Sequence, residues 1–167
     1  MLKPFRHLTQ TEWLTTCKQL YYFMYGLIIA FFTIVLSLNN LNIADTGEPY
    51  KLFDPNEQAG MIVQYAVIIY TLASIPGVLY WFKRSCAKIA KIEDEDLKYD
   101  TYFSYATIRM GVIAFAMVFG LLAYMLLGAY NPMIWLTAIA AIAFVFTKPT
   151  AAKAEEELRP QDENLKY

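Results

Sequence analysis

Residues 20–38 read LYYFMYGLIIAFFTIVLSL and contain no charged side chain. Three further apolar stretches follow, over residues 59–82, 102–127 and 131–148. The hydrocarbon core of a bilayer is about 30 Å thick and a helix rises about 1.5 Å per residue, so about 20 apolar residues cross it. A backbone in lipid must satisfy its own hydrogen bonds, and therefore we expect each stretch to be a helix. The sequence predicts an all-α integral membrane bundle of four transmembrane helices.

The composition also favours a membrane protein. The 167 residues are 57% hydrophobic and only 17% charged, whereas soluble proteins carry about 25% charged residues. The 14 Lys and Arg are balanced by 15 Asp and Glu, and without a basic excess we expect no nucleic acid partner. We divide the chain into an amphipathic leader over residues 1–19 at the cytoplasmic surface, a transmembrane domain over 20–149, and a polar cytoplasmic tail over 150–167.

Basic side chains are distributed unequally among the predicted loops. Apart from Arg109, nearly all of them lie in the leader, in the loop over residues 83–101 and in the tail. The loop over residues 39–58 holds only Lys51, and the turn over residues 128–132 holds none. Because Lys and Arg are retained on the cytoplasmic side, we expect both termini in the cytoplasm.

Few residues of the sequence are suited to catalysis. Its only histidine, His7, lies in the leader, and no predicted span contains Asp or Glu. A metal site of clustered His and Cys, or an intramembrane proton relay, would lack its ligands or carriers. Cys17 and Cys86 fall on the cytoplasmic side, where thiols stay reduced, and are expected to be apolar fillers. We predict no catalytic residue, no metal, no cofactor and no enzymatic activity.

Arg109 is the one charged residue inside a predicted span, apart from Lys148 at the last position of the fourth. A charge in the bilayer costs about 3 kcal/mol on insertion scales, so it marks a paired or a functional site. The side chain could snorkel to lipid phosphates or pair within the protein. Pro76 has no backbone N–H, so it leaves the Leu72 carbonyl without its helical donor. In one form of pairing, the Arg109 guanidinium donates to this free carbonyl. The other polar candidates within the spans are Gln64, Tyr70 and Ser74.

Small residues four positions apart predict close packing of helices. The pairs are Ala73 and Gly77, Ala116 and Gly120, and Thr137 and Ala141. The first and third spans both start with Tyr-rich turns, so the chain could be an internal repeat of two spans each.

The acidic runs at residues 93–96 and 155–157 are interpreted as solvated faces.

The chain resembles a family of small bacterial four-helix membrane proteins with no known activity. The resemblance is carried by Leu8-Thr9 before the first span, by Arg109 early in the third, and by Lys148-Pro149-Thr150 with Glu155 to Leu158 after the fourth. Some members place a Glu shortly after the Arg, where this chain has Val112, Ile113 and Ala114. The resemblance implies a bacterial inner or plasma membrane location and supplies no activity.

The leading hypothesis from the sequence is a non-enzymatic structural or accessory subunit that works by helix packing. Its partners would be membrane lipids and another membrane protein or further copies of itself. The alternative is a small transporter or channel, acting as an oligomer, with a polar path around Arg109. A lipid-modifying enzyme is disfavoured because the spans offer no acid, His or Cys pair.

Overall fold

The computed structural model describes residues 10–159 and is all-α. Five helices follow one another in this part of the chain: α1 (Gln10–Thr46), α2 (Gln58–Ile89), α3 (Glu95–Leu126), α4 (Asn131–Phe146) and α5 (Ala151–Glu157). The predicted all-α class is therefore confirmed. Residues 1–9 of the predicted leader, including His7, and residues 160–167 of the predicted tail lie outside the described residues.

Three helices are long and apolar enough to cross a membrane, namely α1, α2 and α3. Helix α4 has 16 residues, which corresponds to about 24 Å and is less than the hydrocarbon thickness. It qualifies only together with α5, which follows after a bend of 89°. The predicted fourth span over residues 131–148 is thus not a full-length helix. The reason is local: the residue before Pro149 is disfavoured in the helical region, so the helix ends ahead of it.

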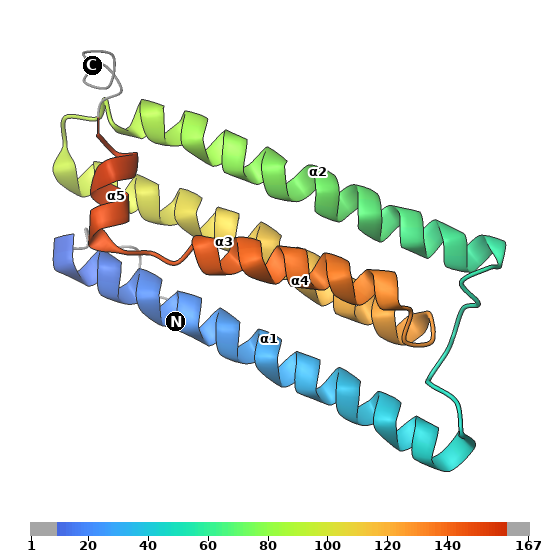
Figure 1. Cartoon of the computed structure of the whole chain (residues 1–167). Coiled ribbons are helices and arrows are strands. Elements are labelled where there is room, and N and C mark those ends of the chain that lie inside the picture. The colour runs from blue at the N-terminus through green and yellow to red at the C-terminus, as the bar shows by residue number, and fades with distance from the viewer. Residues whose placement is uncertain (1–9, 160–167) are drawn as a thin grey trace, which may run out of the picture.

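Helix α3 lies at the centre of the bundle. It packs against α1, α2 and α4, and these three contact it more than they contact one another. Figure 1 shows α1 and α2 on opposite sides of the α3–α4 hairpin, with α5 lying across one end. Because α4 is short, it covers only part of α3, and α5 lies next to the part that α4 leaves uncovered.

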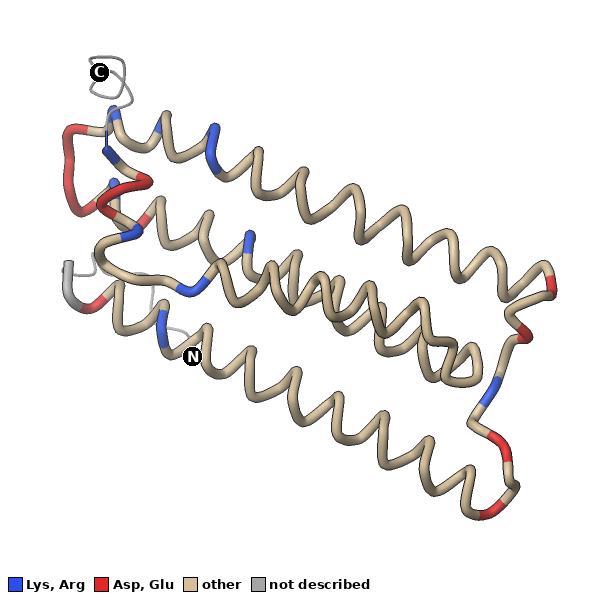
Figure 2. The backbone as a smooth tube through the Cα atoms, in the orientation of Figure 1, with Lys and Arg blue, Asp and Glu red and all other residues tan. Residues whose placement is uncertain are grey.

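The outer surface of the three long helices is apolar. Exposed large side chains include Phe23, Ile34 and Leu41 on α1 and Ile69 and Tyr80 on α2. Such a continuous apolar surface is unfavourable in water and is expected of helices in lipid. Figure 2 shows that charged residues gather at the two ends, with nearly all Lys and Arg at the end that carries α5.

The first turns of α1 are part of the bundle core. Helix α1 continues without a break through residue 19, where the sequence suggested the end of a leader. Trp13 is buried and stacks on Tyr99 with ring centroids 5.3 Å apart. It also makes an edge contact with Tyr102, with ring centroids 5.6 Å apart. These contacts fix the start of α1 against the start of α3.

Candidate functional site

The site is centred on Arg109, which is buried on α3 and forms an ion pair. Its Nη1 donates to Oε1 of Glu157 at 3.1 Å, and the two side chains are 4% and 21% exposed. Glu157 is the last residue of α5. The carboxylate that neutralises Arg109 therefore comes from the polar segment after the last apolar helix. The interpretation of residues 155–157 as a solvated face is wrong for Glu157.

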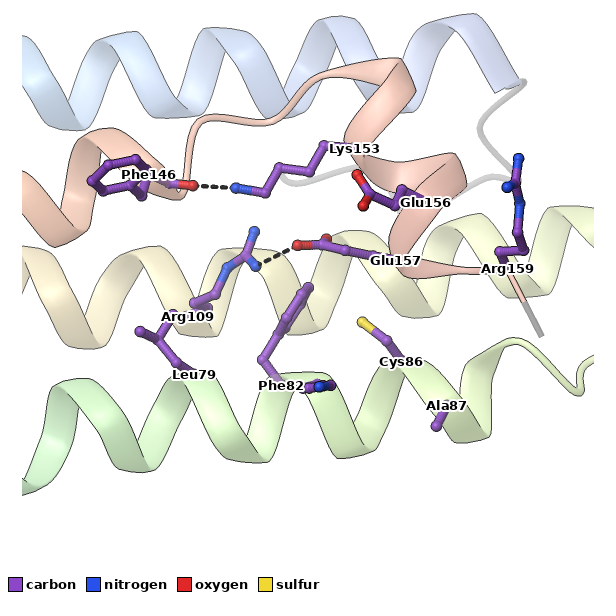
Figure 3. Close-up of a pocket in the computed structure, with 11 residues that line it drawn as sticks. Leu79, Phe82, Cys86, Ala87, Arg109, Phe146, Lys153, Glu156, Glu157 and Arg159 are labelled. Atoms are coloured by element: carbon purple, nitrogen blue, oxygen red, sulfur yellow. Dashed lines mark hydrogen bonds and ion pairs between the residues drawn. The ribbon is translucent and has the colours of Figure 1, made fainter. Parts of the chain in front are cut away.

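Two aromatic residues complete the surroundings of this ion pair. The hydroxyl of Tyr102 donates to Oε2 of Glu157 at 2.6 Å, so both carboxylate oxygens accept a hydrogen bond. Tyr102 and Arg109 are seven residues apart on α3, which places them two turns apart on one face. The guanidinium carbon of Arg109 lies 3.7 Å from the centre of the Phe82 ring on α2. Figure 3 shows the guanidinium near the Phe82 ring and directed at Glu157.

Local sequence explains why α5 turns back toward α3. Pro149 stops α4, and Thr150 starts α5 by accepting a hydrogen bond from the backbone N–H of Lys153 at its hydroxyl, at 3.3 Å. The ammonium group of Lys153 donates to the carbonyl of Phe146 at the end of α4. Ala154 and Leu158 are buried in the same hydrophobic cluster as Phe82 and Tyr102. The apolar side of this short helix thus holds Glu157 in place.

A cavity of about 530 Å³ lies beside the ion pair, between α2, α3 and α5. Its lining contains the cationic residues Lys83, Arg109, Lys153 and Arg159, with Glu156 and Glu157 as the acids. Leu79, Phe82 and Phe146 form an apolar part of the wall. The buried Nε of Arg109 has no hydrogen-bond partner among the residues described. The site combines an excess of positive charge with an apolar wall, a combination suited to an anionic amphiphile.

The predicted contact between Arg109 and the Leu72 carbonyl is not what the structure shows. The guanidinium lies over Phe82 and bonds to Glu157. A helical side chain leans toward the N-terminus of its own helix. For α3 that direction leads toward Tyr102 and the α5 end. Leu72 lies ten residues before Phe82 on α2, about 15 Å farther toward the other end.

The other polar candidates lie apart from Arg109. Gln64 donates to the carbonyl of Pro55 at 2.7 Å, near the start of α2. The Tyr70 ring contacts Phe115 and Phe119 of α3. Ser74 has a buried hydroxyl with no partner among the residues described, and Pro76 lies on the exposed side of an uninterrupted α2. The structure therefore brings no polar path together from these residues and Arg109.

The predicted packing residues fall into two groups. Gly120 of α3 lies against Thr137 of α4, so closely that a Cβ atom on Gly120 would be 2.4 Å from the Thr137 hydroxyl oxygen. Ala116 is buried on the same side of α3, and Ala141 packs against the same core. The α2 pair is different, because Ala73 is exposed and a Cβ atom on Gly77 would meet nothing within 4 Å.

The cysteines and acidic groups of the described residues form no candidate metal site. Cys17 and Cys86 are free and buried. Within residues 10–159, no group of three or more His, Cys, Asp or Glu could hold a metal ion.

A second cavity, of about 570 Å³, lies at the opposite end beside Lys51 and Asp54. There the backbone N–H of Asn56 and the Lys51 ammonium lower the pKa of Asp54. The Lys51–Asp54 pair is exposed, and such pairs contribute little to stability.

Sequence reasoning missed Glu157, Tyr102 and Phe82 as partners of Arg109. One signal was present: the spans contain a charged Arg and no acid, and a buried charge needs a partner. The nearest acids after the fourth apolar stretch are Glu155, Glu156 and Glu157. The sequence alone did not show which of them turns inward.

No family model, curated protein or solved structure matches the chain. The resemblance to small bacterial four-helix membrane proteins stays a prediction.

Proposed function

We propose that the chain is a non-enzymatic multi-pass membrane protein that acts as an accessory subunit by packing against a second membrane protein or another copy of itself. The observation that carries the proposal is the open small-residue face of α2. The pairs on α3 and α4 are used within the bundle, whereas Ala73 and Gly77 are exposed with nothing against Gly77. Small residues let a second helix approach closely in lipid, where packing drives association.

The proposed topology has four spans with both termini in the cytoplasm of a bacterial inner or plasma membrane. Helix α4 and the segment to Thr150 would form the fourth crossing, since the chain returns to the end where the basic residues gather (Figure 2). The positive-inside rule assigns that end to the cytoplasm.

We expect a cysteine at position 155 to be protected from a membrane-impermeant maleimide in intact cells and labelled once the membrane is opened. A cysteine at position 48, in the loop after α1, is expected to be labelled in intact cells. Glu48 and Glu155 are both exposed, so accessibility depends on the side of the membrane. Labelling of position 155 from outside would contradict the topology. The native Cys17 and Cys86 are both buried, so we expect little background labelling from them.

The α2 face is tested by a photo-crosslinking residue in place of Ala73 in native membranes. We expect a protein adduct, and we expect Gly77→Leu to abolish it by filling the face. Gly26→Leu on α1 is the matched control, since a Cβ atom there also meets nothing within 4 Å. An adduct of twice the chain mass of 19.2 kDa identifies a second copy. Crosslinks to lipid alone, or an adduct unaffected by Gly77→Leu, would rule the face out.

A transporter or channel is the second candidate, because a cavity reaches the intramembrane Arg109. Transport needs a path between the two membrane faces. The cavity at Arg109 lies at the α5 end, and the cavity beside Lys51 lies at the opposite end. The two cavities share no lining residue, so a transport path would have to connect them. Solute flux into liposomes that is lost in Arg109→Ala would favour this candidate over the accessory subunit.

A further inference from the structure

We propose that the cavity beside Arg109 binds the phosphate group of an anionic phospholipid from the leaflet in which α5 lies. The proposal goes beyond the accessory role and rests on the membrane assignment of the three long helices. Lipid binding is tested on the purified chain alone. A negative result would therefore not bear on the proposal that the α2 face packs against another protein.

The charges around the cavity favour an anion. Outside the Arg109–Glu157 ion pair, three cationic side chains and one acid line it. Lys83 and Arg159 are exposed and form no ion pair within residues 10–159. A positively charged pocket at the end of membrane helices attracts phosphate headgroups.

A buried donor also points to a ligand. Arg109 lines the cavity, and its Nε is buried with no hydrogen-bond partner among the described residues. Leaving such a donor unpaired is unfavourable, because the group has lost its water without gaining an acceptor. A phosphate oxygen in the cavity would be an acceptor of the right charge once the guanidinium turns toward it, since arginine binds phosphate with charge-assisted hydrogen bonds.

The apolar wall distinguishes a lipid from a free phosphate. Leu79 and Phe146 line the cavity and are also exposed on the outer surface of the bundle. The cavity is therefore continuous with the apolar surface of α2 and α4. Acyl chains can lie along this surface while the phosphate enters beside Lys83, whereas inorganic phosphate would gain nothing from it.

The test measures apparent affinity of the purified full chain for phosphatidylglycerol by native mass spectrometry and by thermal stabilisation in detergent. We expect phosphatidylglycerol to bind and stabilise more than phosphatidylcholine with the same acyl chains. Lys83→Gln and Arg159→Gln are each expected to weaken binding about fivefold, and the double variant about 25-fold. Lys88→Gln is the matched control, because Lys88 is exposed on α2 and does not line the cavity.

Three results would overturn the proposal. One is equal binding of phosphatidylglycerol and phosphatidylcholine, and another is a double variant that binds like the wild type. The third is inorganic phosphate giving the same stabilisation at the same concentration, since this would remove the role of the apolar wall. The melting temperature of each variant in phosphatidylcholine shows whether a loss of binding comes from unfolding, because Lys83 and Arg159 are exposed and should be dispensable for folding.

Discussion

Replacing Glu157 with Gln is expected to lower the free energy of unfolding of the chain by about 3 kcal/mol, because removing one partner of a buried ion pair leaves an uncompensated charge. Arg109 would remain buried on α3 with the Phe82 ring as its remaining described partner. The hydrogen bond from Tyr102 would also pass from a carboxylate to a neutral amide. Reversible unfolding by SDS in mild detergent measures the loss.

Two variants separate this effect from other causes. Glu155→Gln removes the same charge from an exposed position on α5 and is expected to change stability by less than about 0.5 kcal/mol. The double variant Arg109→Leu with Glu157→Leu is expected to recover most of the loss, since replacing a whole buried pair by apolar residues is often neutral. If Glu157→Gln is as stable as the wild type, Arg109 does not depend on Glu157 for its counter-charge, and the ion pair is not the centre of the site.

Gly120→Ala is expected to destabilise the chain by about 2 kcal/mol through overpacking between α3 and α4. Its Cβ atom would be 2.4 Å from the hydroxyl oxygen of Thr137. That hydroxyl already donates to the carbonyl of Met133 at 3.0 Å, so moving it breaks a buried hydrogen bond. Thermal unfolding in detergent measures the effect.

Gly111→Ala is the control for Gly120→Ala. It lies on the same helix, and its Cβ atom would meet nothing within 4 Å. Ala favours a helix over Gly, so this control should be neutral or stabilising. Adding Thr137→Ala to Gly120→Ala removes the clashing oxygen and should restore stability. A Gly120→Ala variant as stable as Gly111→Ala would mean that α3 and α4 are packed less tightly than the distance indicates.

The helical class follows from the sequence because lipid permits few alternatives. A charge-free stretch such as residues 20–38 must satisfy its own backbone, and α1, α2 and α3 cover the first three predicted spans. The fourth span begins at Asn131 as predicted, but its helix ends at Phe146, two residues before the predicted end. The effect of Pro149 on the preceding residue was the local signal for this end.

The sequence predicted one member of the candidate site, Arg109, but none of its partners. Arg109 stands out because a charge among apolar residues is costly. Its partner lies 48 residues later in the chain, and no helical periodicity connects positions so far apart. The direction of the arginine side chain on α3 could have excluded Leu72, since a helical side chain leans toward the start of its helix. The inward turn of Glu157 depends on how α5 docks, which is a tertiary contact.

The separation of Arg109 and Glu157 along the chain has a consequence for biogenesis. Arg109 is synthesised well before Glu157, so in the proposed topology the arginine would enter the bilayer before its counter-ion has been made. During this interval the guanidinium must be held by headgroups or water near the surface. In that topology α3 would reach its final depth after α5 has been made, so a ribosome stalled before residue 157 should leave an insertion intermediate that is readily extracted from the membrane.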